Sequence, residues 1–298
     1  MSYFKSEGEM AVKKIIILLV VFMFAIPVMS VQAVASKGKI LLVASSTSTL
    51  ELKDHRSMAT GFYLNELAVP ALRLIEEGYE VVVATPNGNK PVMDAHSSNA
   101  KLFGNDQAAL QRALHFVDTY PSIQHPITLK EAVDSGLDQY SGIYVPGGHA
   151  PMNDLIQDAS LGEVLRYFHQ QAKPTAFLCH GPIAALAALT DASAYRKALV
   201  NGDFDAQKST SVNWQYAGYH MTVFSNVEEY PGEKKLQGQV PFYVADALQI
   251  AGGIVEHGPI MKSYVVRDRE LITGQNPASD HALAEELIKA LNEKQAGK

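Results

Sequence analysis

The sequence contains a single cysteine, Cys179, among its 298 residues. One cysteine excludes an internal disulfide. Free cysteine is among the most buried residue types, so this thiol is either a structural core residue or a reactive group. Composition alone leaves both interpretations open.

The sequence also lacks a basic segment and any excess of positive charge. Lys and Arg total 25 against 31 Asp and Glu, which gives a formal net charge of −6 with histidine neutral. An acidic chain of this kind argues against a nucleic-acid partner. With 47% apolar and 19% charged residues, the composition is that of a globular protein with small-molecule or polypeptide ligands.

Long apolar runs are absent apart from one near the N-terminus, where residues 15–28 follow two lysines. This run is short for a membrane-spanning helix, which needs about 20 residues. Its basic, apolar and small-residue parts are typical of a secretory signal, with cleavage after Ala33 or Ala35. We therefore predict a signal peptide over residues 1–35 and an exported protein, periplasmic or secreted. The alternative is a membrane anchor formed by the uncleaved segment.

The rest of the chain alternates between strand-like and helix-like segments. Continuous apolar strands separated by helices predict an α/β fold, with a mainly parallel central sheet covered by helices on both faces. Two less regular stretches, 87–138 and 201–219, are interpreted as insertions in a single domain over 36–298, the first as a lid over the strand ends. Pro70 is expected to kink or divide the first helix. The predicted strands are 39–44, 79–86, 141–149 and 175–179, with a hairpin at 265–273, and the predicted helices are 61–78, 161–171 and 278–292.

Two of the predicted strands end in chemically unusual turns, P-G-G-H at 146–149 and C-H-G-P at 179–182. Ligands bind at the carboxyl ends of the strands in an open parallel sheet. A sharp turn from strand to helix exposes the turn residue, as in the nucleophile elbow of hydrolases. A helix N-terminus beside Cys179 is expected to lower the pKa of the thiol, and a fall of about two units makes the thiolate dominant at neutral pH.

A Cys-His dipeptide alone is weak support for an active site, because adjacent side chains need not touch and His180 could simply cap the helix. Four longer stretches resemble the PfpI superfamily, and more closely its branch of heat-shock chaperones and glutathione-independent glyoxalases (glyoxalase III). They are F-L-C-H-G-P, V-P-G-G-H-A-P-M-N-D-L, G-F-Y-L-N-E-L-A-V-P and L-I-T-G-Q-N-P-A-S. The resemblance implies a flavodoxin-like three-layer sandwich, shared with class I glutamine amidotransferases, that usually forms homodimers. Most relatives are cytosolic, so the predicted signal peptide is a departure.

The resemblance also implies a set of catalytic residues. Cys179 matches the nucleophile, and His180 matches the histidine beside it. Glu66 matches a glutamate on the first helix that hydrogen-bonds to the thiol. The acidic third member of the triad is Glu229, with Glu228 as the alternative.

Substrate and oxyanion contacts are assigned by the resemblance to Gly147, Gly148 and His149. The backbone N–H groups of Gly148 and of the histidine after the cysteine resemble the family's oxyanion hole. His149 is interpreted as a wall of the pocket or a turn residue, because no second acid partners it in the sequence. Two residues depart from the family pattern, Ala150 in place of glycine and Asn153 in place of tryptophan. The second departure is expected to make one pocket wall smaller and more polar.

The implied function is that of a cysteine-dependent glyoxalase III-type lyase or hydrolase that acts on small reactive aldehydes. It would convert methylglyoxal to lactate without glutathione, or remove adducts from glycated proteins. The thiolate attacks the aldehyde, and His180 oriented by Glu229 moves the proton, with Glu66 as the rival base. Glu66 protonated at rest requires a raised pKa. No metal or organic cofactor is needed. The alternatives are a holdase chaperone for unfolded proteins, a redox sensor without turnover, and a cysteine peptidase or amidase.

Overall fold

The structure is a computed structural model that describes residues 36–297, so the predicted signal peptide at 1–35 lies outside the described residues. A seven-stranded sheet has the order β10-β11-β7-β6-β1-β4-β5. All neighbouring strands are parallel except β10 and β11, which form an antiparallel hairpin. The strands are β1 (Lys39–Val43), β4 (Glu80–Thr85), β5 (Ile127–Thr128), β6 (Tyr140–Val145), β7 (Thr175–Leu178), β10 (Val265–Asp268) and β11 (Leu271–Gly274).

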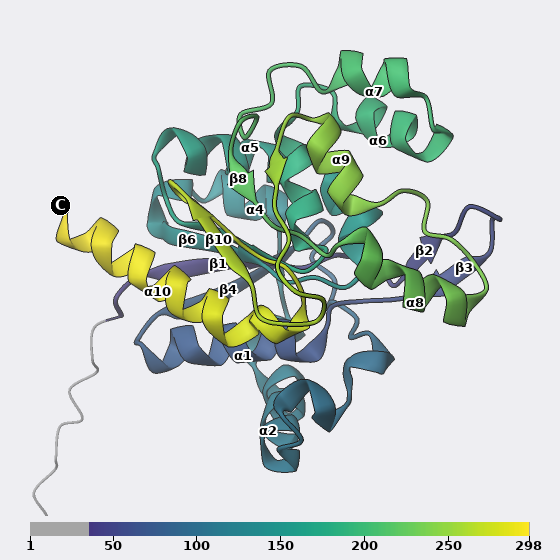
Figure 1. Ribbon diagram of the computed structural model, residues 1–298. Coiled ribbons are helices and arrows are strands. Elements are labelled where there is room, and N and C mark those ends of the chain that lie inside the picture. Colours follow the sequence, from purple (N-terminus) through teal and green to yellow (C-terminus); the bar gives the residue numbers. More distant parts are fainter. Residues whose placement is uncertain (1–35, 298) are drawn as a thin grey trace, which may run out of the picture. The chain divides into compact units, whose positions relative to one another are not determined.

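Helices cover both faces of this sheet, which confirms the predicted three-layer α/β architecture (Figure 1). Successive residues of β1 point to opposite faces, so Ile40 and Leu42 join one apolar cluster while Leu41 and Val43 join the other. The first face carries α1 (Leu64–Glu76), α2 (Gln107–Thr119) and α10 (Asp280–Ala296), and the second carries α4 (Leu129–Asp134), α5 (Ala159–Gln170) and the 3₁₀ run η6 (Gly181–Ala188).

Smaller elements surround the strand ends. Two two-stranded sheets are formed by β2 with β3 and by β8 with β9. Further elements, in chain order, are β2 (Thr49–Glu51), β3 (Ser57–Ala59), α3 (Pro121–Gln124), α6 (Ala192–Asn201), α7 (Phe204–Thr210), β8 (His220–Met221), α8 (Asn226–Leu236), α9 (Val244–Ile250) and β9 (Ile254–Val255), with short 3₁₀ turns between them. No helix among residues 36–297 has the length and apolar character needed to cross a membrane.

The helix predicted over 61–78 is present as α1, and it runs through Pro70 as one continuous helix, so the proline does not divide it. Proline has no N–H, so the carbonyl of Glu66, four residues earlier, loses its helical donor. The buried hydroxyl of Tyr144 on β6 donates to that carbonyl instead. The sheet therefore supplies the hydrogen bond that Pro70 removes, and the same bond ties the start of α1 to β6.

The two stretches predicted as insertions contain regular elements. The first, 87–138, holds α2, α3 and α4 together with β5, which pairs with β4 at one edge of the sheet. The second, 201–219, contains α7 and the buried rings of Trp214, Tyr216 and Tyr219. Trp214 Nε1 donates to the carbonyl of Ala185 in η6, so this stretch packs onto the run that follows the cysteine.

Candidate active site

Cys179 lies directly after β7 in the left-handed region of backbone space, with φ 61°. This φ is uncommon for a residue that carries a side chain, and it bends the chain sharply at the strand end. Two backbone hydrogen bonds hold the bend. The N–H of Cys179 donates to Gly274 O (2.8 Å), and its carbonyl accepts from the N–H of Phe224 (3.0 Å). The chain therefore makes the predicted sharp turn, but a 3₁₀ run follows it rather than an α-helix.

The expected lowering of the Cys179 pKa is wrong. The residue is 3% exposed, and burial raises the pKa of its thiol well above the ordinary value, with the Glu66 carboxylate raising it further. The backbone N–H groups of Gly148 and His180 hydrogen-bond to the sulfur and act in the opposite direction without outweighing burial. The resting group is thus a thiol, and its ionisation requires a base.

Glu66 on α1 is completely buried beside this thiol. The N–H of Gly147 donates to Oε2 (2.9 Å), while Oε1 has no hydrogen-bond partner among the described residues. Burial raises the pKa of Glu66 to about 8, and its contacts with Cys179 and Gly147 offset that rise only in part. The carboxyl is therefore protonated at neutral pH, in agreement with the expectation from the sequence, and holds a proton next to the sulfur.

His180 connects the thiol to a carboxylate. Its Nδ1 lies 3.3 Å from Cys179 Sγ, and its Nε2 lies 2.6 Å from Glu229 Oε2. A carboxylate accepts hydrogen bonds, so Nε2 carries the proton and Nδ1 presents a lone pair to the thiol. Burial lowers the pKa of His180, which keeps the ring neutral. Phe224 stacks on the ring with centroids 4.6 Å apart and fixes its orientation.

The structure brings Glu229, and not Glu228, to His180. Both residues lie in the first turn of α8, whose N-cap is Ser225. Burial raises the pKa of Glu229, but the imidazoles of His149 and His180 outweigh it and hold that pKa well below its usual range. Glu228 points the other way and completes a capping box with Ser225. Its carboxylate also accepts from Met261 N, Gln275 Nε2 and Asn276 Nδ2.

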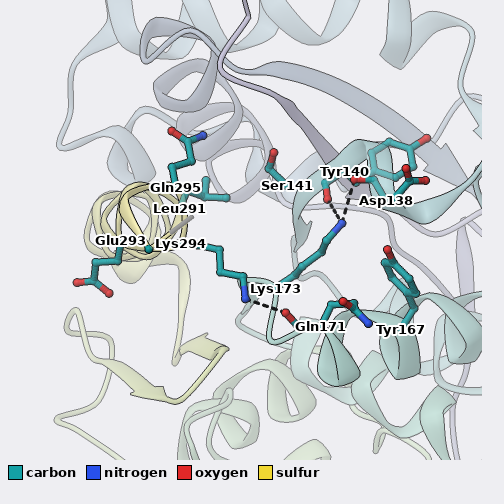
Figure 2. Close-up of a pocket in the computed structure, with 11 residues that line it drawn as sticks. Asp138, Tyr140, Ser141, Tyr167, Gln171, Lys173, Leu291, Glu293, Lys294 and Gln295 are labelled. Carbon is teal, nitrogen blue, oxygen red and sulfur yellow. Dashed lines mark hydrogen bonds between the residues drawn. The ribbon is translucent and has the colours of Figure 1, made fainter.

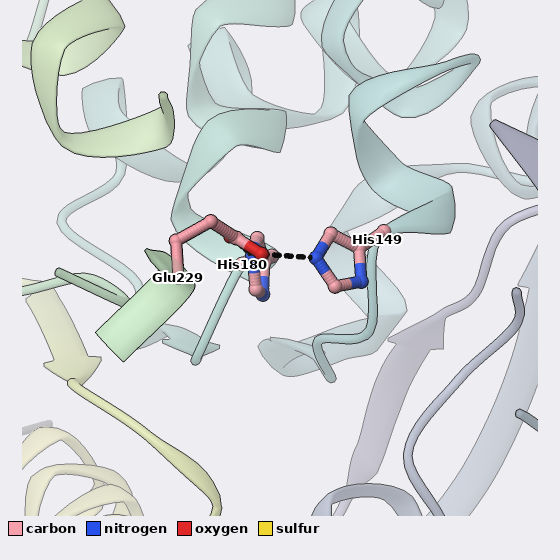
Figure 3. A group of neighbouring side chains, drawn as sticks. All are labelled: His149, His180 and Glu229. Carbon is pink, nitrogen blue, oxygen red and sulfur yellow. Dashed lines mark hydrogen bonds and ion pairs between the residues drawn. The ribbon is translucent and has the colours of Figure 1, made fainter. Parts of the chain in front are cut away.

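His149 has a partner that was missed from the sequence. Its Nε2 lies 2.8 Å from Glu229 Oε1, so one carboxylate joins two histidines (Figure 3). Burial lowers the pKa of His149, but the charge of Glu229 and its hydrogen bond more than compensate, and the pKa lies above its ordinary value. The interpretation of His149 as a residue without an acidic partner is therefore wrong. Glu229 lies 80 residues away in the sequence and also contacts His180. Only the P-G-G-H turn at a strand end indicated that His149 would lie at the site.

The glycines of the P-G-G-H turn allow this convergence. Gly148 has φ +89°, and a Cβ there would lie 1.9 Å from the carbonyl oxygen of Gly61. A Cβ at Gly147 would lie 2.6 Å from Glu66 Oε2. Real Cβ atoms do not tolerate such distances, so both positions require glycine for the turn to approach α1.

A cavity of about 230 Å³ opens beside His149. Of the stretch predicted as a lid, only Asp94 and His96 line this cavity. Asn153 is not among the lining residues, because its amide bonds to Thr49 O and Arg196 Nη2. Asn153 therefore does not form a wall of this cavity. The other lining residues are Met58, Ala59, Tyr63, Gly232, Lys235 and Leu236.

A second and larger cavity, of about 460 Å³, lies at the amino ends of the strands, where its lining includes residues that begin β6 and precede β7 (Figure 2). Lys173 donates there to the carbonyls of Asp138 and Tyr140, and Lys294 donates to the carbonyl of Gln171. The lining contains neither cysteine nor histidine. The reactive groups therefore gather at the carboxyl ends of the strands, as open parallel sheets lead one to expect.

The fold and this site define a class of α/β proteins in which a cysteine follows a central strand and contacts a histidine and a buried glutamate. Residues 57–198 of the chain match the model of the DJ-1/PfpI family. The protein/nucleic acid deglycase HchA of Pseudomonas aeruginosa is 23% identical over 259 residues, which cover 86% of this chain and 81% of that protein.

Solved structures show the same fold. Glyoxalase III of Candida albicans superposes with a TM-score of 0.58 at 20% identity, over 85% of this chain and 97% of that one. The Rapid Encystment Protein 24 KDa of Francisella tularensis superposes with a TM-score of 0.62 at 22% identity, over 85% and 99%. The expected flavodoxin-like arrangement is thereby confirmed. Relatives that are deglycases support an enzymatic activity for this chain.

Proposed function

We propose that this protein is an exported, cysteine-dependent enzyme that acts on small reactive aldehydes without glutathione. Its reaction would be the conversion of methylglyoxal to lactate, the removal of such adducts from glycated proteins, or both. The observation that carries the proposal is the continuous contact from Cys179 through His180 to Glu229, with the protonated Glu66 on the other side of the sulfur. Similarity to the deglycase HchA supports the substrate class.

The first step in this proposal is activation of the thiol. His180 Nδ1 takes the proton from Sγ, and Glu229 stabilises the imidazolium that forms. The sulfur then bonds to the aldehyde carbon, and the resulting alkoxide oxygen takes the proton from the His180 imidazolium, which gives a neutral hemithioacetal and restores His180 as a base. The N–H groups of Gly148 and His180 point at the sulfur and so lie beside the oxygen that gains charge, as electrostatic stabilisation requires.

The second step moves a proton between the two oxygen-bearing carbons. A base removes the hydrogen from the former aldehyde carbon, and the adjacent carbon receives a proton through an enediol. His180 is our candidate for this base, and Glu66 supplies the nearby proton. The product is a lactoyl thioester on Cys179, which water cleaves to lactate while the thiol is restored.

A substrate panel on the wild type and on Cys179→Ser tests the proposal. The wild type should form lactate from methylglyoxal without glutathione, and the variant should lose at least about 10³-fold in rate because the oxygen of serine is far less ionised. His96→Asn is a matched control, since His96 lines the cavity beside His149 and its ring contacts Asp94 instead of the thiol. Activity that survives in Cys179→Ser would end the proposal. Release of glyoxal adducts from a modified peptide distinguishes deglycase from glyoxalase activity.

The alternative functions draw less support from the site. A redox sensor needs a thiolate that oxidants can reach, whereas this thiol is buried with a raised pKa. No feature of residues 36–297 favours a peptidase or a holdase. Homodimerisation and export remain part of the proposal on the strength of the resemblance and the N-terminal sequence.

A further inference from the structure

Three side chains converge on one point at the mouth of the active site. His149 follows β6, His180 follows β7, and Glu229 reaches in from the start of α8 (Figure 3). One ligand atom from each residue can be chosen so that all three lie within 4.8 Å of one another. The carboxylate oxygens lie 2.8 Å from His149 Nε2 and 2.6 Å from His180 Nε2.

We propose that this triplet is a binding site for a divalent transition-metal ion of the zinc type, and that an ion bound there switches the enzyme off. Two imidazole nitrogens and one carboxylate oxygen form a donor set that Zn²⁺ accepts, with bond lengths of about 2.0–2.2 Å. Ca²⁺ and Mg²⁺ prefer oxygen ligands throughout, so the two histidines select against them. The sequence had given no expectation of a metal.

The surroundings of the triplet give an ion a path into the site. They also leave one coordination position of the ion open. His149 has a side chain that is 17% exposed and lines the cavity of about 230 Å³, which provides a path from solvent. His180 and Glu229 lie behind it with 2% and 7% of their side chains exposed. Three protein ligands leave the fourth position of a tetrahedral site to water from the cavity.

Inhibition follows from the chemistry of His180, and this part of the inference rests on the proposed function. In the unliganded site Nε2 carries the proton and Nδ1 accepts from Cys179. An ion on Nε2 takes its lone pair, so the neutral ring then carries its proton on Nδ1. Nδ1 then faces the thiol as a donor and can no longer accept its proton. Glu229 binds the ion and is no longer the hydrogen-bond partner of His180.

Titration of the full-length protein with Co²⁺ tests the site, because four-coordinate Co²⁺ gives visible absorption bands that report its ligands. We expect bands in the wild type that Zn²⁺ abolishes by competition. His149→Asn should weaken Co²⁺ binding by about 10-fold or more. His96→Asn, from the same cavity wall, should bind like the wild type. Cys179→Ser should also keep the bands, because the sulfur lies on the opposite side of the His180 ring.

Equal affinity in His149→Asn and the wild type, or loss of the bands in Cys179→Ser, would overturn the assignment. Anomalous diffraction from a wild-type crystal soaked in Zn²⁺ covers the case in which His149→Asn fails to fold, since a strongest peak away from the triplet also overturns it. Binding and turnover are separate readouts. If the wild type shows the triplet-dependent bands but no glyoxalase activity, only the proposed function is refuted. If it turns over at full rate with Zn²⁺ bound at the triplet, the inhibition is refuted.

Discussion

At the scale of single residues, the sulfur of Cys179 and the carboxyl of Glu66 are two acids buried side by side, each with a raised pKa. Neighbouring groups of this kind lose their protons as a pair, because one negative charge opposes the next. The pair keeps one proton after the other has passed to His180. Because Glu66 keeps its proton, the Cys179 thiolate lies beside a neutral acid and not beside a second negative charge.

Glu66→Gln should change how stability depends on pH. The pKa of Glu66 is about 8 in the folded protein against an ordinary 4.5, so between these values the folded state binds more protons than the unfolded state. Its contribution to stability is therefore fully present below about pH 4.5 and is lost as the pH rises to about 8, by up to about 1.4 kcal/mol per pH unit. Urea unfolding of both proteins across this range measures the difference. If the free energy of unfolding changes with pH in the same way in both proteins, Glu66 is ionised in the folded state.

The adjacent pair Glu228 and Glu229 offers a matched comparison. Glu229→Gln should lower kcat by about 100-fold, because His180 loses its carboxylate, and should also cost about 1–3 kcal/mol of stability, because both histidines lose a charged acceptor. Glu228→Gln should cost about 1–3 kcal/mol of stability, because several donors lose a charged acceptor, and leave kcat nearly unchanged. Steady-state kinetics and thermal unfolding of the two variants decide this. The reverse pattern would mean that the side-chain directions are misassigned.

Part of this site was predictable from the sequence, because Cys179 and His180 are neighbours and Glu66 lies in a stretch that resembles the family. The choice between Glu228 and Glu229 was not predictable, since the two are adjacent in the chain and only the start of α8 decides which one turns inward. The His149–Glu229 contact joins residues 80 positions apart. The direction of the Cys179 pKa was also missed, because it depends on burial and on Glu66 and not on the local turn.

At the scale of elements, α1 contains a proline that it accommodates with help from the sheet. Pro70 leaves the carbonyl of Glu66 without a helical donor, and the hydroxyl of Tyr144 takes that place. The strand β6 thereby orients the helix that carries the acid beside the thiol. Periodicity predicted the helix, but a hydrogen bond across 78 residues could not be read from it.

A double-mutant cycle should reveal this compensation. Tyr144→Phe leaves the buried Glu66 carbonyl unpaired and should destabilise the protein by about 1–3 kcal/mol. In the Pro70→Ala background residue 70 regains an N–H for that carbonyl, so the same change should cost less by about 1 kcal/mol. Denaturant unfolding of the four proteins gives the coupling. Equal costs in both backgrounds would show that the tyrosine hydroxyl is not replacing the missing helical donor.

The strands and main helices were predictable because buried parallel strands are continuously apolar and the helices that cover them are amphipathic. The wall of the active-site cavity was not predictable. It combines Met58 and Ala59 of β3 with Gly232, Lys235 and Leu236 of α8. These segments meet through long-range contacts, such as Arg56 Nη2 donating to Gln237 O, that no local pattern encodes.

At the scale of the whole molecule, the contacts that build the sheet and the site lie within residues 36–297. The segment predicted as a signal peptide precedes them, and β1 begins only at Lys39. A chain beginning at Ser36 should therefore show the same melting temperature and the same activity as the full-length chain, as thermal unfolding and kinetic assays of the two proteins would measure.

The proposed export can be measured directly. Mass spectrometry of protein from the medium or periplasm of producing cells should find an N-terminus that begins after Ala33 or Ala35. Replacing the two lysines before the apolar run by glutamate should reduce the exported amount, and the precursor should accumulate. An unprocessed chain recovered with membranes would instead establish the anchored alternative.

The helix α8 does two things at once. Its first turn holds Glu229 against both histidines, and its last turns form part of the wall of the cavity beside His149. Under the proposed function, a substrate that displaces the far end of this helix would also move the carboxylate at the near end. The size of the substrate would then change the proton affinity of His180. Discrimination between a three-carbon aldehyde and a bulkier adduct would then be expressed as speed of reaction and not as tightness of binding.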